Sequence, residues 1–326
     1  MSFLKKTIFE IKKILMEQFE LHNSVIDGGE YDYPQLLYST PAFLNANNHL
    51  PQKHFYFFNK SSNKYLAHLA ASVDGDIAVS PLKAPFGGVE FEESLSAADL
   101  KNFIKAVENT LASDGVQEIR LHQPPENYQL QDTINDVLLE LEYDIIQERD
   151  YHGIDIDGLP LSEKMVDMQK RRLKKCEKAG FIYKKYRKSE LAGAFHQIDR
   201  WRTAADKRLS MTWADLHNSS KRNPKAYHAF GIENDHGLMI AGSIVVKVSD
   251  RVLYNFFPAS YDAYNAYSPM VMLTNKIYEW GQANGFTHLD LGTSYVHKNV
   301  NTGLRLFKER LGGKVYRAWS WRKKIS

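Results

Sequence analysis

The chain contains one cysteine, Cys176, among 326 residues. A single cysteine excludes an internal disulfide and a cysteine-rich zinc site. No apolar run approaches the roughly 18 residues that indicate a membrane span. The apolar N-terminal segment, residues 3–16, is interrupted by four lysines, so it lacks the continuous apolar core of a secretory signal. These absences predict a cytoplasmic protein without a membrane span.

Motifs of several enzyme classes are also missing. The sequence has no Gly-x-x-x-x-Gly-Lys-Ser/Thr, no His-Glu-x-x-His and no Gly-x-Ser-x-Gly. Its 12 histidines show no spacing typical of metal ligands. Nicotinamide-dependent, ATP-hydrolysing and metallohydrolase functions therefore have little support. We expect no metal site and no tightly bound cofactor.

What is present is a repeat of element order. The front half reads as two strands, a Pro/Gly loop, a helix, a strand, a helix and a closing strand. The back half repeats this order about 171 residues later. The first copy comprises residues 64–73, 76–82, 84–88, 97–112, 116–122, 130–141 and 143–156. The second comprises residues 236–248, 251–258, 259–268, 269–284, 286–291, 300–311 and 314–323.

The repeat predicts two α/β (α+β) domains. Gly, Asp and Pro gather in the segment 153–161, where the first closing strand ends. We therefore place the boundary near residue 160, which gives domains 1–160 and 161–326. Two copies of one fold that meet at an interface form a cleft, a common place for a ligand.

Charge is unevenly distributed along the chain, whose formal net charge is +3. Residues 1–160 hold 12 basic and 25 acidic residues, whereas residues 161–326 hold 30 and 14. The densest basic stretch, residues 164–188, has 11 lysines and arginines against two carboxylates. This stretch is either a solvated helix face or a surface for a polyphosphate such as coenzyme A, a nucleotide-sugar carrier or tRNA.

The second half as a whole reads strand, helix, helix, three strands, helix, strand, helix and closing strand. Three segments carry a family resemblance: KRRLKKCEKAG (170–180), VLYNFFPASYDAYNAYSP (252–269) and HLDLGTSYVHKNVNTGLRLFKERLGG (288–313). The order and these segments resemble the GNAT acyltransferase fold. Two such domains in tandem resemble the FemAB-like group, relatives of the Fem-type peptidoglycan aminoacyltransferases. The resemblance implies two GNAT-like domains, each a mixed, mostly antiparallel sheet flanked by helices.

Two features depart from these families. The pyrophosphate signature of acetyl-coenzyme A enzymes, Arg/Gln-x-x-Gly-x-Gly/Ala, is absent before residue 269 and before residue 97. The long helical arm that some Fem enzymes use for tRNA is absent too. The first departure bears on acyl-coenzyme A binding, and the second bears on the use of tRNA.

The resemblance implies a donor site in the second domain. In GNAT-like folds the fourth and fifth strands separate, and here these strands are residues 251–258 and 286–291. The following helix begins at Pro269, and its free N–H groups and positive dipole end suit an anion. Capping alone also explains Ser268 and Pro269. The expected donor contacts are Tyr254, Asn255, Phe256, Ser268, Ser294 and Lys298.

Acyl transfer needs an uncharged amine, a donor for the oxyanion and an acid for the leaving group. Asp290 lies at a strand end, where it either holds or deprotonates the amine or caps the Gly-Thr-Ser turn. Tyr295 is a candidate acid. Arg305 and Lys308 are either one basic face or solvated residues.

Acceptor contacts are expected in both halves. Pro85, Phe86, Gly87 and Gly88 occupy the position of a Pro/Gly loop beside the acceptor in Fem-type enzymes, although an ordinary loop would use the same residues. Trp201 and Arg202 resemble the aromatic and basic pair that covers the acceptor in GNAT-like folds.

The sequence thus predicts an acyltransferase that moves an acyl or aminoacyl group from acyl-coenzyme A to an amine, on a cell-envelope or polysaccharide precursor. The first alternative is an aminoacyl-tRNA-dependent Fem-type peptidyltransferase, because of the basic second half. The second alternative is a non-catalytic binding module that keeps the fold. We expect a small-molecule or envelope-precursor partner, with tRNA open and DNA not expected.

Overall fold

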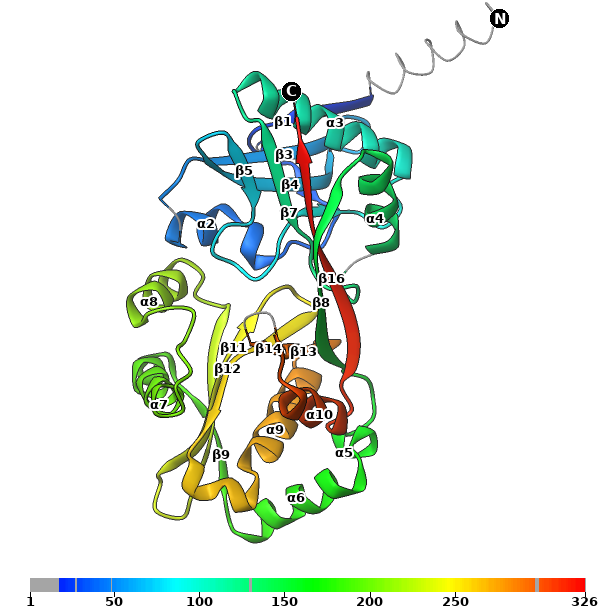
Figure 1. Cartoon of the computed structure of the whole chain (residues 1–326). Coiled ribbons are helices and arrows are strands. Elements are labelled where there is room, and N and C mark those ends of the chain that lie inside the picture. Colours follow the sequence, from blue (N-terminus) through cyan, green and yellow to red (C-terminus); the bar gives the residue numbers. More distant parts are fainter. Residues whose placement is uncertain (1–17, 27, 48, 129–130, 297–298, 326) are drawn as a thin grey trace, which may run out of the picture. The chain divides into compact units, whose positions relative to one another are not determined.

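The structure is a computed structural model that describes residues 18–26, 28–47, 49–128, 131–296 and 299–325 (Figure 1). The residues group into two compact units. The N-terminal unit comprises Met1–Glu148 and Ala318–Ser326, and the C-terminal unit comprises Arg149–Arg317. Each unit is described by itself below.

The N-terminal unit is built on one sheet with the strand order β1-β3-β4-β5-β7-β16. The pairings along it are antiparallel except for β5 with β7, and the short strands β2 and β6 pair with β4. The strands are β1 (Phe19–His22), β2 (Glu30–Tyr31), β3 (Gln52–Asn59), β4 (Lys64–Asp74), β5 (Ile77–Ser80), β6 (Val89–Phe91), β7 (Glu118–His122), β8 (Asp144–Asp155) and β16 (Lys314–Lys324). Short helices η1 (Leu37–Ser39) and α2 (Pro41–Asn47) precede β3.

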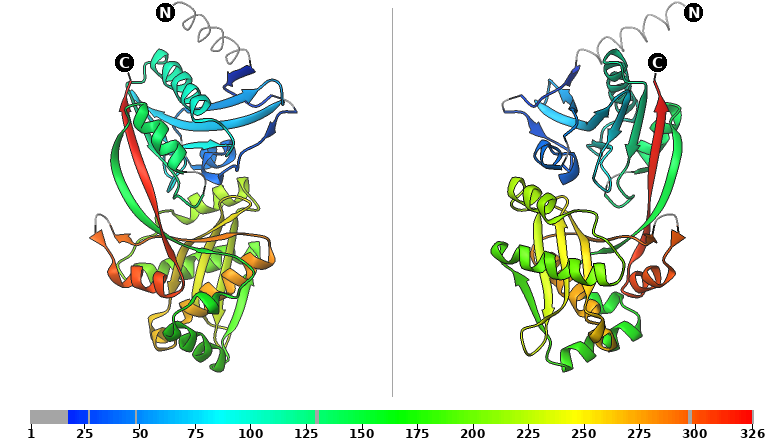
Figure 2. Two further views of the ribbon diagram at one scale, coloured as in Figure 1. Left: turned by 90° about the vertical axis from the view of Figure 1, so that its right-hand side faces the viewer. Right: turned by 60° about the vertical axis from the view of Figure 1, so that its left-hand side comes forward.

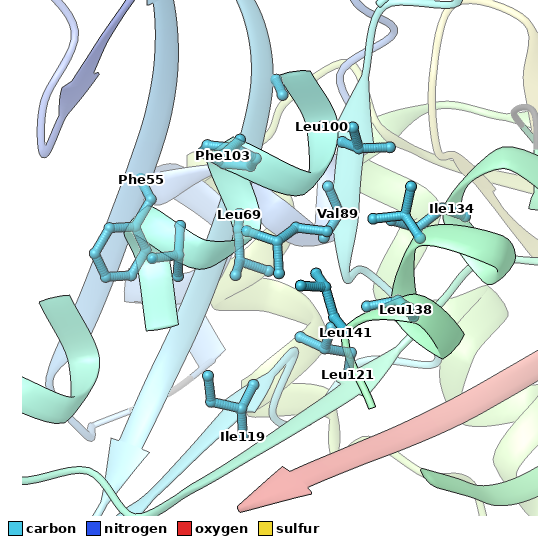
Figure 3. Close-up of a cluster of buried hydrophobic side chains, with 14 of the residues drawn as sticks. Phe55, Leu69, Val89, Leu100, Phe103, Ile119, Leu121, Ile134, Leu138 and Leu141 are labelled. Carbon is cyan, nitrogen blue, oxygen red and sulfur yellow. The ribbon is translucent and has the colours of Figure 1, made fainter. Parts of the chain in front are cut away.

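Two helices, α3 (Ala97–Ser113) and α4 (Gln131–Glu140), cover this sheet (Figure 2). Apolar residues recur at helical spacing along α3, and this stripe faces the core. The core joins the stripe to apolar residues of β3, β4 and β7 and to α4, as Figure 3 shows for Phe55, Leu69, Phe103 and Ile134. The amphipathic pattern therefore fixes which face of the sheet the helices cover.

The C-terminal unit has the strand order β8-β13-β12-β11-β10-β9, and only β12 and β13 pair in parallel along it. Its further strands are β9 (Ile182–Tyr186), β10 (Tyr227–Glu233), β11 (Met239–Lys247), β12 (Val252–Ser260), β13 (His288–Thr293), β14 (Tyr295–Val296) and β15 (Asn299–Val300). Its helices are α5 (Leu161–Lys164), α6 (Asp167–Lys178), η2 (Lys188–Glu190), α7 (Leu191–Ala204), α8 (Trp213–Arg222), η3 (Asp262–Tyr267), α9 (Pro269–Ala283) and α10 (Thr302–Arg310).

Helices cover both faces of the C-terminal sheet. Strand β11 is buried along nearly its whole length, as expected for a strand with helices on both sides. Figure 1 shows α7 and α8 on one face and α9 on the other. The contacts agree, because Ile198 of α7 lies against Gly242 of β11, whereas Leu253 of β12 lies against Gly281 of α9.

The two units differ from the predicted domains 1–160 and 161–326. The chain crosses from one unit to the other within β8 and again within β16. Residues 151–155 of β8 pair with β13 in the C-terminal unit, and residues 320–324 of β16 pair with β7 in the N-terminal unit. The chain therefore passes between the units inside two strands, at residues 148–149 and 317–318, and not near residue 160. Residues 153–155 of the Gly/Asp/Pro segment end β8, and residues 156–160 connect β8 to α5.

Candidate functional site

The parallel strands β12 and β13 separate after a short paired segment. Their pairs run from Val252 with His288 to Tyr254 with Asp290, and none follows although β12 continues to Ser260. Beyond this point β13 pairs with β8 alone, for example Thr293 with Tyr151. The predicted separation of these strands is confirmed.

Strand β12 also carries an irregularity beside the gap. Its partner residues on β11 step from Ile244, opposite Phe257, to Val245, opposite Asn255, so Phe256 is the extra residue of a bulge. Leu253 packs toward α9, and Phe257 packs toward Phe195 of α7 with ring centroids 6.4 Å apart. By strand alternation, Asn255 shares the α9 face with Leu253, whereas Tyr254 faces α7.

A cavity of about 1050 Å³ opens at this gap and is lined from both faces of the sheet. On the α7 face the wall comes from α7 and the loop that follows it; on the α9 face it comes from α6, α9 and α10. The lining residues that bear on the chemistry are Arg172, Trp201, Arg202, Asp206, Lys207, Arg208, Tyr254, Asn255, Phe256, Asp262, Ser268, Pro269, Met270, Thr274, Leu291, Tyr295, Leu304, Phe307, Lys308 and Leu311.

The N-terminus of α9 lies at the cavity. Pro269 occupies the first helical turn as predicted. Ser268 occupies the N-cap position as predicted, but it has φ 57° and its side chain forms no capping hydrogen bond. Helix α6 holds the preceding loop: Lys175 Nζ donates to Ala266 O at 2.7 Å, and Cys176 Sγ donates to Tyr267 O at 3.0 Å. The helix start is thus positioned by α6 and left uncapped toward the cavity.

The cavity wall is positively charged. Five cationic side chains line it, namely Arg172, Arg202, Lys207, Arg208 and Lys308, against the two carboxylates Asp206 and Asp262. Part of the charge comes from the loop after α7, where sequence analysis singled out no site. An anionic ligand, or one with an anionic carrier, therefore suits this cavity.

Lys308 is the most unusual of these cations. It is the one buried residue of α10, whereas Leu304 and Leu306 of the same helix are exposed. Its Nζ donates to Gly292 O at 2.8 Å and to Thr293 O at 2.7 Å. Burial lowers the pKa of Lys308 to about 8, and the nearby Asp290 carboxylate opposes that shift. An ammonium has three donors, so one remains for a ligand.

Asp290 is buried beside Lys308 but does not line the cavity. Its Oδ1 accepts the N–H of Gly292 at 2.6 Å, which supports the turn-capping interpretation. Burial and the Asp290 charge together raise the pKa values of the Tyr151 and Tyr254 hydroxyls. Asp290 is therefore a fixed negative charge that holds the turn under Lys308.

The structure brings most of the predicted C-terminal residues together. Tyr254, Asn255, Phe256, Ser268, Tyr295, Trp201 and Arg202 all line the cavity. Ser294 is buried next to it, and its Oγ has no hydrogen-bond partner among the described residues. Lys298 lies outside the described residues. The aromatic-rich segment 254–267 contributes Tyr254 and Phe256 to the wall, while Phe257 is in the core.

The predicted acceptor loop lies in the N-terminal unit and does not line this cavity. Phe86 is buried, and Gly87 donates its N–H to His122 O at 2.8 Å. Gly88 has φ 71°, and a Cβ there would lie 2.6 Å from the side chain of Gln123. Close packing accounts for both glycines. Contact of Pro85, Phe86, Gly87 and Gly88 with an acceptor remains a prediction.

Sequence reasoning missed the role of Lys308 and the cations Arg172, Lys207 and Arg208. The signal for Lys308 was its place in a helix that otherwise shows leucines, but a lysine there predicts a solvated face. Within the described ranges, no set of three His, Cys, Asp or Glu side chains is placed to bind a metal ion. No helix among the same residues has the length and apolarity to span a bilayer.

Comparison with known proteins agrees with this geometry. Residues 168–299 match the family model described as "Acetyltransferase (GNAT) domain". Among solved structures, FemX has a TM-score of 0.69 at 10% identity, over 84% of this chain and 88% of that one. L-PGS from Bacillus licheniformis has a TM-score of 0.58 at 16% identity, over 92% and 95%. No curated protein matches the sequence.

Residues 168–299, which lie in the C-terminal unit, are therefore similar to a GNAT acetyltransferase domain. The chain's mixed sheets flanked by helices, present in both units, are the tandem GNAT-like fold that the sequence predicted. The chain as a whole has a fold similar to that of FemX, over 84% of its length.

Proposed function

We propose that the C-terminal unit transfers an acyl or aminoacyl group from a carrier to an amine, with acyl-coenzyme A as the donor. The observation that supports this most is the cationic cavity at the gap between β12 and β13, with the start of α9 in its wall. The gap leaves backbone groups of β12 without a partner strand on that side. An extended acyl carrier can bind to such groups.

The donor would lie on the α9 face. The positive dipole end at the start of α9 and the Arg172 guanidinium provide for phosphate groups of the carrier. The apolar residues Met270, Leu304 and Phe307 provide for its uncharged arm. Asn255, Phe256 and Ser268 line the cavity along the gap between these two ends, and Tyr254 would contact the donor from the α7 side of the gap. Ser294 and Lys298 belong to the segment that follows β13.

The reaction would proceed through attack of a neutral amine on the acyl carbonyl. A nitrogen–carbon bond forms, the carbon–sulfur bond of the thioester breaks, and the thiolate leaves with a proton released by the amine. The remaining donor of Lys308 can stabilise the oxyanion in the tetrahedral intermediate. Asp290 positions the turn that binds Lys308, and Tyr295 in the cavity wall can protonate the leaving group.

The acceptor would be an amine on a cell-envelope or polysaccharide precursor in the cytoplasm, reached from the α7 face through Trp201 and Arg202. An alternative donor is aminoacyl-tRNA, which the basic charge of residues 161–326 and the FemX-like fold favour. A non-catalytic binding module is favoured by the missing pyrophosphate signature.

A thermal-shift screen of the full chain tests these alternatives with coenzyme A, acetyl-coenzyme A, bulk tRNA and a nucleotide-linked muropeptide. We expect coenzyme A to raise Tm, and Arg172→Gln to weaken this effect. Lys174→Gln is the matched control, because Lys174 is exposed on the same helix and does not line the cavity.

A tRNA shift that survives moderate salt, without a coenzyme A shift, would favour the tRNA-dependent reaction. A shift with the muropeptide alone, and no turnover with any donor, would favour the binding module. Equal loss of the coenzyme A shift in both variants would contradict the placement of the donor on the α9 face.

A further inference from the structure

Two aromatic side chains form a parallel pair at the α7 end of the cavity. Trp201 lines the cavity near the end of α7, and Tyr261 follows the last residue of β12. Their ring planes differ by 4° and their centroids are 6.4 Å apart. Tyr261 is 41% exposed, although a tyrosine in an ordinary packed position would be mostly covered. Trp201 thus presents aromatic surface at the cavity, and the exposed Tyr261, which does not itself line the cavity, extends this surface beside Trp201.

Cations without an ion-pair partner among the described residues line the same cavity as Trp201. Arg202, Lys207 and Arg208 line the cavity, and none of them forms an ion pair within the part of the chain that the structure describes. The Nε of Arg202 is buried and has no hydrogen-bond partner among those residues. Burial without a partner is unfavourable for a guanidinium and lowers its pKa. A bound anion would supply the missing acceptor.

We propose that the Trp201–Tyr261 pair binds the ring of the acceptor, and that this acceptor is an amino sugar carrying a phosphate. The inference rests on the proposed transfer to an amine. The reaction requires an amine, and the aromatic surface favours a ring whose apolar face can stack on it. The buried Arg202 Nε without an acceptor, together with the exposed Lys207 and Arg208 in the same lining, favours an anion. A phosphorylated amino sugar combines these three groups in one small molecule.

The position of the ring pair assigns it to the acceptor and not to the carrier. Trp201 and Tyr254 are on the α7 face, whereas the start of α9, which suits the carrier phosphates, is reached from the opposite face. The two substrates then meet at the gap between β12 and β13. Trp201 therefore selects for the ring, and Arg202 and Arg208 bind the phosphate.

Binding of matched probes to the full chain tests this assignment by calorimetry. Glucosamine 1-phosphate carries amine, ring and phosphate; phosphoethanolamine lacks the ring, and glucosamine lacks the phosphate. We expect glucosamine 1-phosphate to bind about fivefold tighter than phosphoethanolamine, because ring stacking contributes about 1 kcal/mol. Trp201→Ala should remove that difference, and Trp201→Phe should keep it. Arg202→Gln should weaken the binding of glucosamine 1-phosphate and of phosphoethanolamine, and it should leave the affinity for glucosamine unchanged.

Trp213→Ala is the control, since Trp213 is half-buried on α8 and does not line the cavity. Binding of UDP-glucosamine is compared with binding of glucosamine 1-phosphate to distinguish a nucleotide-linked sugar from a free sugar phosphate. Tighter binding of either one supports the proposal if that binding depends on Trp201. Binding of AMP that depends on Trp201, without binding of the sugar phosphate, would overturn it in favour of a base site. An unchanged probe ratio in Trp201→Ala would also overturn it. Coenzyme A binding, measured in parallel, shows whether the proposed function fails as well.

Discussion

At the scale of single residues, the site depends on a buried lysine, a residue type that usually reaches solvent. Helical spacing places Lys308 on the same face of α10 as Leu304 and the buried Leu311, and Lys308 is buried there. The sequence showed a basic residue at this position but not the direction of its side chain. The carbonyl oxygens of Gly292 and Thr293 at the end of β13 accept hydrogen bonds from the Lys308 ammonium. Only the folded chain brings these residues together. Tyr254, Phe256 and Trp201 could be predicted because aromatic residues are conspicuous in the sequence.

Replacing Lys308 tests its role as the cation at the acyl carbonyl. We expect Lys308→Met to lower the transfer rate about 100- to 1,000-fold, the usual effect of removing one oxyanion donor. Because the pKa of Lys308 is lowered to about 8 and only the ammonium can act, the rate should fall as pH rises through about 8. Lys308→Arg stays protonated and should keep residual activity without this alkaline fall. A wild-type profile that keeps rising to pH 10 would contradict the assignment.

A second residue-scale prediction concerns acid stability in the N-terminal unit. Burial lowers the pKa of His54 to about 4, and its Nδ1 lies 3.1 Å from Nε2 of His68. The folded state thus favours neutral His54, so its stabilising contribution is complete above the unfolded pKa of about 6.5 and decreases as pH falls toward 4.

Urea unfolding at pH 7.5 and pH 5 measures this effect. The free energy of unfolding should fall less between the two pH values in His54→Gln than in wild type. His236→Gln serves as the control, because the His236 side chain is 84% exposed. The same fall in all three proteins would mean that His54 does not contribute.

At the scale of elements, the bounds of regular helices could be predicted from the sequence, but the pairing partners of the closing strands β8 and β16 could not. Helix α9 follows from Pro269 and from the apolar stripe of Met270, Leu273, Ile277 and Trp280, and its bounds agree with the prediction within a residue. Strands β8 and β16 were predicted as closing strands of separate domains. Instead β8 pairs with β13 of the C-terminal unit and β16 pairs with β7 of the N-terminal unit, because nothing in a strand's residue pattern states which neighbour it pairs with.

The pairing of β8 with β13 depends on close approach at Gly153. A Cβ at this position would lie 2.1 Å from Nε2 of His288, which is buried on β13. We expect Gly153→Ala to lower the free energy of unfolding by about 1–3 kcal/mol through overpacking. Gly158→Ala, where a Cβ meets nothing within 4 Å, should change it by less than about 0.5 kcal/mol. Denaturant unfolding measures the free energy of unfolding of both variants. Equal stability of Gly153→Ala and Gly158→Ala would contradict the close packing at Gly153.

At the scale of the whole molecule, charge separates along the chain. Residues 161–326 hold 30 basic residues against 14 acidic ones, and the sequence alone could not say which of these face a ligand. Some basic residues of helix α6 contact the cavity or the loop beside it, and others are exposed to solvent. Arg172 lines the cavity and Lys175 holds the loop before α9. Arg171, Lys174 and Lys178 are exposed and form no ion pair within the described ranges.

These three exposed cations should govern any binding of RNA to the chain. Their side chains recur three and four residues apart, so they form one stripe on the outer face of α6. A phosphate backbone bound there releases about 0.7–0.9 counterions per neutralised charge. We therefore expect the triple variant Arg171→Gln, Lys174→Gln, Lys178→Gln to reduce the slope of log affinity for tRNA against log salt by about 2–3. Filter binding at several salt concentrations measures it.

The matched control removes three lysines of the N-terminal unit, Lys53, Lys60 and Lys64, each of which is ion-paired with a carboxylate of that unit. It changes the net charge equally, so it should lower affinity only slightly and leave the slope unchanged. If both triple variants reduce the slope alike, net charge and not the α6 stripe attracts RNA. Coenzyme A binding should be the same in all three proteins, because none of the six side chains lines the cavity. A coenzyme A site that weakens with the stripe would instead extend the donor site onto the outer face of α6.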